Sequence, residues 1–276
     1  PFVFPRLLEV ALFCRMRKKG VTMISNGYKG TREDYETLIN MGVQLFELPV
    51  HSYDSHTHDD IAGKQGAWKR SITSIKEIMD SGGEVVAIIV ITKKNFHQVY
   101  ETMRFIQELG VKRIMLNRFN LGGAGIKEKE TISLSNNQLR EAFASAQKAV
   151  KELKISASSN VCTPFCVLKP EDYPSIGFSA CYPKRNIRPW TLDPSGSIRF
   201  CNHSPHVIGN IYHDSFEDIL ESAYVKEWQN TIPEVCKDCS LYEKCWAGCR
   251  AAAEQIGLPL KYADPVVYDE FGIKIP

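Results

Sequence analysis

The sequence lacks the features that would place a protein in a membrane or on nucleic acid. No apolar stretch reaches the roughly 18 residues that a membrane span requires. The 34 basic and 32 acidic side chains nearly balance at a formal net charge of +2 and are spread along the chain, so no charged footprint for nucleic acid or a lipid surface appears. With 276 residues, 43% of them hydrophobic, the chain can bury one large domain and a smaller one. We therefore expect a soluble globular protein.

Cysteine is scarce in the first half and concentrated in the second. Of nine cysteines, one is Cys14 and the other eight fall between Cys162 and Cys249. An odd total argues against a secreted disulfide framework, so we expect metal binding in a reducing cytoplasm. Cys14 stands among apolar residues of a helical stretch, where core packing is expected.

The first 150 residues repeat one unit, in which a helical pattern ends in glycine and a β-branched run follows. This alternation predicts an α/β fold with a parallel sheet. Its four strands and five helices indicate a partial (β/α) barrel of the TIM-like kind, and the abrupt start on a helix leads us to expect that leading βα units are missing. The first strand present should then be an edge strand. Helix C′ positions with left-handed backbone are expected at Gly20, Gly42, Gly82 and Gly110. Asn95 is expected to cap the next helix, with Gln98 at its third position.

Polar residues follow each expected strand. In a barrel of this kind, chemistry gathers at the carboxyl ends of the strands, although loop and capping roles explain any one of these stretches equally well. The stretches are Ser25–Gly27, His51–Asp54, Thr92–Asn95 and Asn117–Asn120. The histidine-rich stretch 56–60 (HTHDD) suggests a metal site, but a solvated loop is the expectation because no third ligand is nearby in sequence.

The second half carries two cysteine patterns. Cys181 and Cys201 flank the stretch DPSGSIRF, which predicts a tight turn between two short strands that brings the two cysteines together. A C-x2-C-x5-C-x3-C run with no histidine follows, and its members are Cys236, Cys239, Cys245 and Cys249. A hairpin followed by such a loop makes a small metal-nucleated domain, and the spacing alone leaves zinc and iron–sulfur chemistry both open.

The combination C-x14-G-x4-C and C-x2-C-x5-C-x3-C resembles the SPASM domain of radical S-adenosylmethionine (SAM) enzymes. The first half agrees, because residues 1–27 resemble the stretch after the GGEP motif of that superfamily, with Pro1 as its last residue. Residues 50–68 resemble the loop after the fourth strand of the same barrel. The resemblance implies domain boundaries at 1–155 for the barrel, 156–180 for a linker and 181–276 for the SPASM domain.

The resemblance also implies cofactors. A [4Fe–4S] cluster on a C-x3-C-x2-C loop, which this sequence does not contain, would cleave SAM to a radical that abstracts hydrogen from substrate; the chain by itself is therefore expected to be inactive. Two auxiliary [4Fe–4S] clusters would be held, one by Cys181, Cys201 and Cys249, the other by Cys236, Cys239 and Cys245. Their expected work is electron transfer or substrate anchoring. A peptide or protein substrate and an electron donor such as flavodoxin or ferredoxin are the implied partners, without nucleic acid or membrane.

The fourth ligands of the two auxiliary clusters stay open. Either Cys162 or Cys166 can complete the first cluster, or both are unligated linker thiols. Where the family closes the second cluster with a late cysteine, this chain has Val267. We expect a non-cysteine or open position there, filled by Asp264, Asp269, a residue from elsewhere, water or substrate; a degraded or zinc-bound site is the alternative.

The polar strand ends predict the SAM pocket. Short polar side chains there can bond the carboxylate, ribose and adenine edge of the cofactor while apolar neighbours exclude water. The residues predicted to line it are Ser25, Asn26, His51, Ser52 and Asn117. No catalytic side chain is identified. The different-class alternative to this enzyme is a non-catalytic zinc-binding interaction module.

Overall fold

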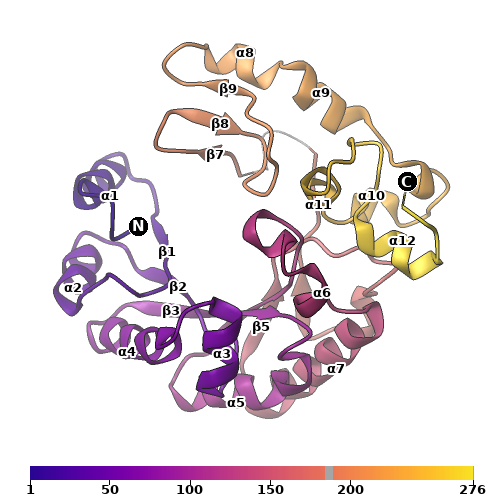
Figure 1. Cartoon of the computed structure of the whole chain (residues 1–276). Helices are drawn as coiled ribbons and strands as arrows, with labels where there is room; N and C mark the ends of the chain where they lie inside the picture. Colours follow the sequence, from indigo (N-terminus) through magenta and orange to yellow (C-terminus); the bar gives the residue numbers. More distant parts are fainter. Residues whose placement is uncertain (184–188, 276) are drawn as a thin grey trace. The chain divides into compact units, whose positions relative to one another are not determined.

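The computed structural model describes residues 1–183 and 189–275, which form two compact units (Figure 1). The first unit contains residues 1–118, 137–159 and 173–177. The second contains residues 119–136, 160–172 and 178–276. Among the described helices, none combines the length and the apolar character that a membrane crossing needs.

The first unit is built on a six-stranded sheet in the order β1-β2-β3-β4-β5-β6, and the pairs from β1 to β5 are parallel. This confirms the predicted α/β fold with a parallel sheet. As expected, β1 is an edge strand of this sheet, and its Ile24 is 63% exposed. The strands are β1 (Thr22–Ile24), β2 (Leu45–Pro49), β3 (Glu84–Ile91), β4 (Arg113–Arg118), β5 (Ser156–Ser159) and β6 (Ile176–Phe178).

Helices with one buried face cover the sheet, and α4, α5 and α7 lie on the same side of it in Figure 1. The buried side chains recur at helical spacing, for example Ile72, Ile75 and Ile78 of α4. The helices of this unit are α1 (Leu7–Met16), α2 (Arg32–Asn40), α3 (Ser55–Ala62), α4 (Ala67–Asp80), the 3₁₀ turn η1 (Phe96–Gln98), α5 (Val99–Glu108) and α7 (Asn136–Leu153).

Three of the four predicted helix-ending glycines are confirmed. Gly42, Gly82 and Gly110 directly follow the C-caps of α2, α4 and α5 and have φ values of 94°, 85° and 93°. The prediction for Gly20 is wrong, because Lys18 takes the left-handed conformation (φ 55°) after α1. The N-cap role of Asn95 also needs correction. Its side chain makes no capping bond to the helix that follows and instead ties together the ends of two strands.

The segment predicted as linker, 156–180, contains the strands β5 and β6, and the predicted domain boundaries stay a prediction. One further expectation is corrected in this unit. Cys14 is half-buried and not part of the core, because α1 buries only Ala11.

The second unit is rich in short elements. The predicted hairpin is present, with β7 pairing antiparallel to β8 around a turn in which Gly196 has φ 85°. Asp193 holds this turn by accepting the N–H groups of Ser195 and Ser197. The elements are η2 (Gly123–Ile126), α6 (Lys129–Ile132), η3 (Pro170–Asp172), β7 (Thr191–Leu192), β8 (Ser197–Arg199), β9 (Gly209–Asn210), α8 (Phe216–Leu220), α9 (Ala223–Asn230), η4 (Glu234–Cys236), α10 (Tyr242–Cys245), α11 (Arg250–Gln255) and α12 (Pro265–Phe271).

Candidate functional site

The turn after β1 is held rigidly by its own side chains and by α4. Ser25 Oγ accepts the N–H of Gly27 at 3.0 Å, and Asn26 Oδ1 accepts the N–H of Tyr28 at 3.1 Å. From α4, Arg70 Nε donates to the carbonyl of Gly27 at 2.7 Å, and Ser74 Oγ donates to the same oxygen at 3.1 Å. The backbone of this strand end is therefore fixed before any ligand binds.

Two stacked histidines follow β2. The N–H of His51 donates to Nδ1 of His58 at 3.0 Å, and the rings stack at 5.0 Å between centroids. Nδ1 of His51 accepts the N–H of Val90 at 3.2 Å. Because Nδ1 accepts in both rings, each neutral ring carries its proton on Nε2. Burial lowers the pKa of His51 to about 3, helped by the neighbouring His58, and burial lowers the pKa of His58 to about 4. Both rings are thus neutral donors near pH 7.

A cavity of about 390 Å³ lies against this pair. It is lined by Asn26, Tyr28, Pro49, His51, His58, Ala62, Lys64, Ala67 and Ser71. Nε2 of His58 is buried and has no hydrogen-bond partner among the described residues. A second cavity, of about 380 Å³, shares Asn26 and Tyr28 and includes Ser25. Volumes of this size and mixed polarity suit a small cofactor.

The structure brings together some of the five predicted pocket residues. Asn26 and His51 line the first cavity, and Ser25 lines the second. Ser52 is fully buried, donates to Gln98 Oε1 at 2.6 Å and accepts the N–H of Asp54 at 2.9 Å, so its hydroxyl holds the turn and lines neither cavity. Asn117 lies on β4, paired with Val90 of β3. Their role as SAM ligands stays a prediction.

The expectation of a solvated loop at 56–60 is wrong. These residues belong to α3, and His58 is fully buried. The sequence predicted a solvated loop because no third metal ligand is near His58 in sequence. A helix start could have been recognised at Asp54, which caps α3 by accepting the N–H of Thr57.

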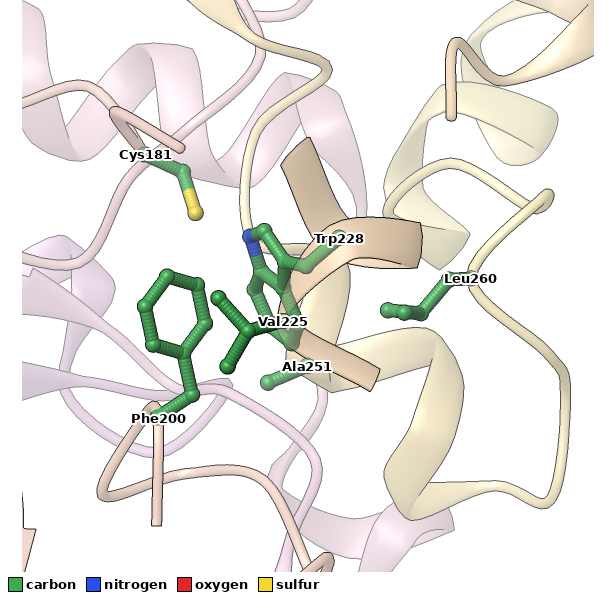
Figure 2. Close-up of a cluster of buried hydrophobic side chains, with 6 residues drawn as sticks. All are labelled: Cys181, Phe200, Val225, Trp228, Ala251 and Leu260. Atoms are coloured by element: carbon green, nitrogen blue, oxygen red, sulfur yellow. The ribbon is translucent and has the colours of Figure 1, made fainter. Parts of the chain in front are cut away.

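In the second unit, a first thiol group surrounds one hydrophobic cluster. We use this name for Cys181, Cys201 and Cys249. Cys181 belongs to the cluster of Phe200, Trp228 and their neighbours, and its Sγ points toward these two rings (Figure 2). Cys201 and Cys249 pack against the same cluster, and so does Cys162.

A second thiol group, Cys236, Cys239 and Cys245, lies at another hydrophobic cluster. Cys236 packs against this cluster, which contains Tyr242, Ala247, Ala263, Val267 and Tyr268. Cys239 and Cys245 are within electrostatic range of Cys236. Trp246 packs against both hydrophobic clusters, and the role of the two thiol groups as cluster ligands stays a prediction.

The backbone around Cys245 is shaped to bind an anionic sulfur. Its Sγ accepts the N–H groups of Phe165, at 3.3 Å, and of Ala247 and Gly248. Trp246, Ala247 and Gly248 all have left-handed backbone, with φ of 55°, 63° and 71°. Such a run curls the chain into a concavity of N–H donors, as is common at iron–sulfur sites, and its strain is typical of functional segments.

The buried thiols of the second unit are suited to bind the positive irons of a cluster, which would stabilise them as thiolates. Burial and the neighbouring cysteines raise the pKa of Cys236 to about 12 and that of Cys166 to about 11. They are therefore protonated thiols near pH 7 until a metal centre displaces their protons. Within the described part of the chain, no three His, Cys, Asp or Glu side chains converge on a single metal-ion position. A [4Fe–4S] cluster takes one thiolate on each of four irons, so its ligands surround it and do not converge on one point.

Comparison with known proteins gives two family matches, one in each half of the chain. The model of the radical SAM superfamily matches residues 1–106, and that of the SPASM iron–sulfur cluster-binding domain matches residues 181–240. A PqqA peptide cyclase from Gluconobacter oxydans is 23% identical over 96% of this chain and 74% of its own length. The subtilosin biosynthesis protein AlbA from Bacillus subtilis is 24% identical over 88% of this chain and 52% of its own.

Solved structures show the same fold. SuiB from Streptococcus suis superposes with a TM-score of 0.75 at 18% identity, covering 96% of this chain and 64% of SuiB. The structure of anSMEcpe with bound AdoMet superposes with a TM-score of 0.68 at 14% identity, covering 98% of this chain and 78% of anSMEcpe. The chain thus spans about three quarters of the PqqA peptide cyclase and less than two thirds of SuiB. The chain belongs to the radical SAM superfamily and carries a C-terminal SPASM iron–sulfur domain.

Proposed function

We propose that this chain is part of an enzyme that modifies a peptide or protein side chain by SAM-dependent hydrogen abstraction, supported by two auxiliary [4Fe–4S] clusters. The observation that carries the proposal is the pair of thiol groups within the second unit: the first lies at one hydrophobic cluster, and the second gathers around Cys236 at another. Two such sites exceed what a single structural metal ion would need.

The proposed substrate class rests on relatives. These include a PqqA peptide cyclase, AlbA of subtilosin biosynthesis, and SuiB, whose structure with the precursor peptide SuiA superposes at a TM-score of 0.71. A counterexample is an AdoMet-dependent heme synthase from Methanosarcina barkeri, 23% identical over 92% of this chain. The peptide substrate is thus proposed from some of these relatives and not from all of them. The SAM-dependent radical chemistry is the broader part of the proposal.

In this proposal the first unit binds SAM, which when bound supplies the radical that abstracts hydrogen. Asn26 and Ser25 offer fixed oxygen and amide groups at the end of β1. His51 and His58 offer neutral Nε2–H donors, while Pro49 and Ala62 line the cavity with apolar surface that excludes water. Asn117 and Ser52 complete the predicted set, Ser52 by holding the turn.

In the second unit, the first thiol group and Cys162 hold one cluster, and the second thiol group holds the other. Hydrogen bonds to sulfur and burial set the potentials of such clusters. The proposed role of these clusters is electron transfer or substrate anchoring, with an electron donor such as flavodoxin or ferredoxin in a reducing cytoplasm. The proposed functional domains are 1–155 and 181–276, joined through 156–180.

The experiment that tests the class of the protein is metal and sulfide analysis after anaerobic purification. We expect about eight irons and eight sulfides per chain and a brown protein with broad visible absorption, from two [4Fe–4S] clusters. Colourless protein with stoichiometric zinc would replace the enzyme by a zinc-binding interaction module.

A further inference from the structure

Cys166 lies with the second thiol group and not with the first. It packs against the same hydrophobic cluster as Cys236, the cluster that contains Val267. Cys245 and Cys239 are both within electrostatic range of Cys166. Cys162, only four positions earlier in the chain, packs against the other cluster, beside Cys181, Cys201 and Cys249. The two cysteines before the SPASM pattern are therefore divided between the two sites.

The segment that carries Cys166 is anchored on both sides. The N–H of Phe165 donates to Cys245 Sγ at 3.3 Å, which fixes the backbone directly before Cys166. Directly after it, Val167 and Leu168 are buried, and both donate their N–H groups to the carbonyl of Pro164. The position of Cys166 thus follows from a closed backbone turn and does not depend on the cysteine side chain itself.

This anchoring explains a glycine in the SPASM run. A Cβ on Gly248 would lie 2.4 Å from Pro164 Cγ, and its φ of 71° disfavours a side chain in any case. Only glycine at position 248 lets the Pro164 turn approach this closely. The run that supplies Cys245 and Cys249 is therefore shaped to receive the segment that carries Cys166.

The other candidates for the fourth ligand are placed less well. Val267, at the position where the family has a cysteine, has no ligating atom; it is 1% exposed and belongs to the cluster against which Cys166 and Cys236 pack. Asp264 is fully buried, and its carboxylate accepts the N–H of Cys249 at 2.8 Å and of Val266 at 3.3 Å as the N-cap of α12. Asp269 lies on the exposed face of α12.

We propose that Cys166 is the fourth ligand of the second auxiliary cluster, replacing the cysteine that the family has at the position of Val267. Its thiol loses a proton to solvent as the Fe–S bond forms. All four irons of this cluster then have a cysteine ligand, which suits electron transfer and leaves no iron open for substrate. The inference rests on the proposed iron–sulfur function and differs from the open or carboxylate position that the sequence favours.

The test compares single alanine variants of this chain after anaerobic reconstitution with iron and sulfide. Cys239→Ala removes a thiolate of the second thiol group, Cys181→Ala one of the first, and Cys14→Ala serves as a control in the first unit. Iron and sulfide per chain, and EPR spectra of the reduced protein, are measured for each. We expect Cys166→Ala to reproduce the Cys239→Ala result, with up to about half of the iron lost and the same EPR signal altered.

A rescue variant separates ligand loss from misfolding. Because Val267 lies at the same hydrophobic cluster, Cys166→Ala combined with Val267→Cys should restore the iron content and a four-cysteine spectrum. Val267→Cys alone should leave the spectrum close to that of the unchanged chain, since every iron already has a thiolate.

The results that would contradict the Cys166 assignment can be told apart from those that would contradict the proposed function. A Cys166→Ala protein that matches Cys14→Ala, or that matches Cys181→Ala, overturns the assignment of Cys166. If Cys239→Ala changes neither the iron content nor the EPR signal, Cys239 holds no cluster and the proposed function fails in that part. A large spectral change in Val267→Cys alone indicates an open iron and also overturns the proposal.

Discussion

Asn120 Nδ2 lies 3.0 Å from Cys249 Sγ, so an amide donor from the loop after β4 contacts a sulfur of the first thiol group. Hydrogen bonds to cluster sulfurs favour the reduced, more negative state. We expect Asn120→Ala to lower the reduction potential of the first auxiliary cluster. A differential of about 1 kcal/mol corresponds to about 40 mV for one electron, so the shift should be tens of millivolts.

This potential can be measured by an EPR-monitored redox titration. Asn230→Ala, at an exposed position that ends α9, is the matched control and should leave both potentials unchanged. An unchanged first potential in Asn120→Ala would show that this contact does not tune the cluster.

Gly248→Ala should damage the second cluster site. The new Cβ would meet Pro164 at 2.4 Å and force the backbone away from its left-handed conformation. We expect about 2 kcal/mol or more of lost stability and less iron in the second cluster after reconstitution. Gly257→Ala is the control, because its φ of 83° is also left-handed but nothing lies within 4 Å of the added Cβ. Equal iron content in the two variants would contradict the close approach.

The sequence was sufficient where the determining interactions are local. Gly42 and Gly110 were identified because a helix end demands left-handed backbone at one residue. The strand β5 was missed because its residues, Ser156–Ser159 with the sequence SASS, include no β-branched or aromatic side chain. Only pairing with β4 makes this segment a strand.

For the candidate site too, the sequence predicts one part, and contacts between distant residues determine the rest. The two thiol groups follow from the resemblance to the SPASM domain, but the place of Cys166 depends on the approach of Pro164 to Gly248 within the second unit. His58 was expected in a solvated loop because no third metal ligand is nearby in sequence, yet it is fully buried and stacks on His51. Contacts between residues distant in sequence leave no periodic pattern that sequence analysis can detect.

Gly27→Ala should destabilise the first unit more than an ordinary glycine substitution at a left-handed position. Gly27 has φ 72°, and a Cβ there would lie 2.7 Å from Ser74 Oγ, which holds the turn after β1. Gly82→Ala is the control, with φ 85° and nothing within 4 Å. Urea unfolding should give a loss roughly 1–2 kcal/mol larger for Gly27→Ala. Equal losses would mean that Ser74 moves aside at no cost.

Asn26→Ala should weaken SAM binding, because Asn26 lines both cavities of the first unit. Loss of one or two hydrogen bonds predicts an affinity reduced about tenfold, measured by calorimetry under anaerobic conditions. Ser52→Ala should have a smaller effect, since its hydroxyl is bonded to Gln98 and Asp54 and lines neither cavity. Combining the two changes should weaken binding further. Unchanged affinity in the double variant would remove the pocket assignment.

The stacked pair His51 and His58 makes the stability of the first unit depend on pH. Both imidazoles have folded-state pKa values, about 3 and about 4, far below the 6.5 of an unfolded chain. Between pH 6.5 and 4 the unfolded state therefore binds protons that the folded state does not, and the free energy of unfolding falls as pH falls. At pH 7.5 this cost is absent.

Urea titrations at pH 7.5 and 5.0 should show the loss in the unchanged chain and a smaller loss in His58→Gln, which keeps a side chain that can accept the N–H of His51. His56→Gln, on the exposed face of the same helix, is the control and should keep the full dependence. The same slope in His58→Gln and in the unchanged chain would show that other groups set the pH dependence.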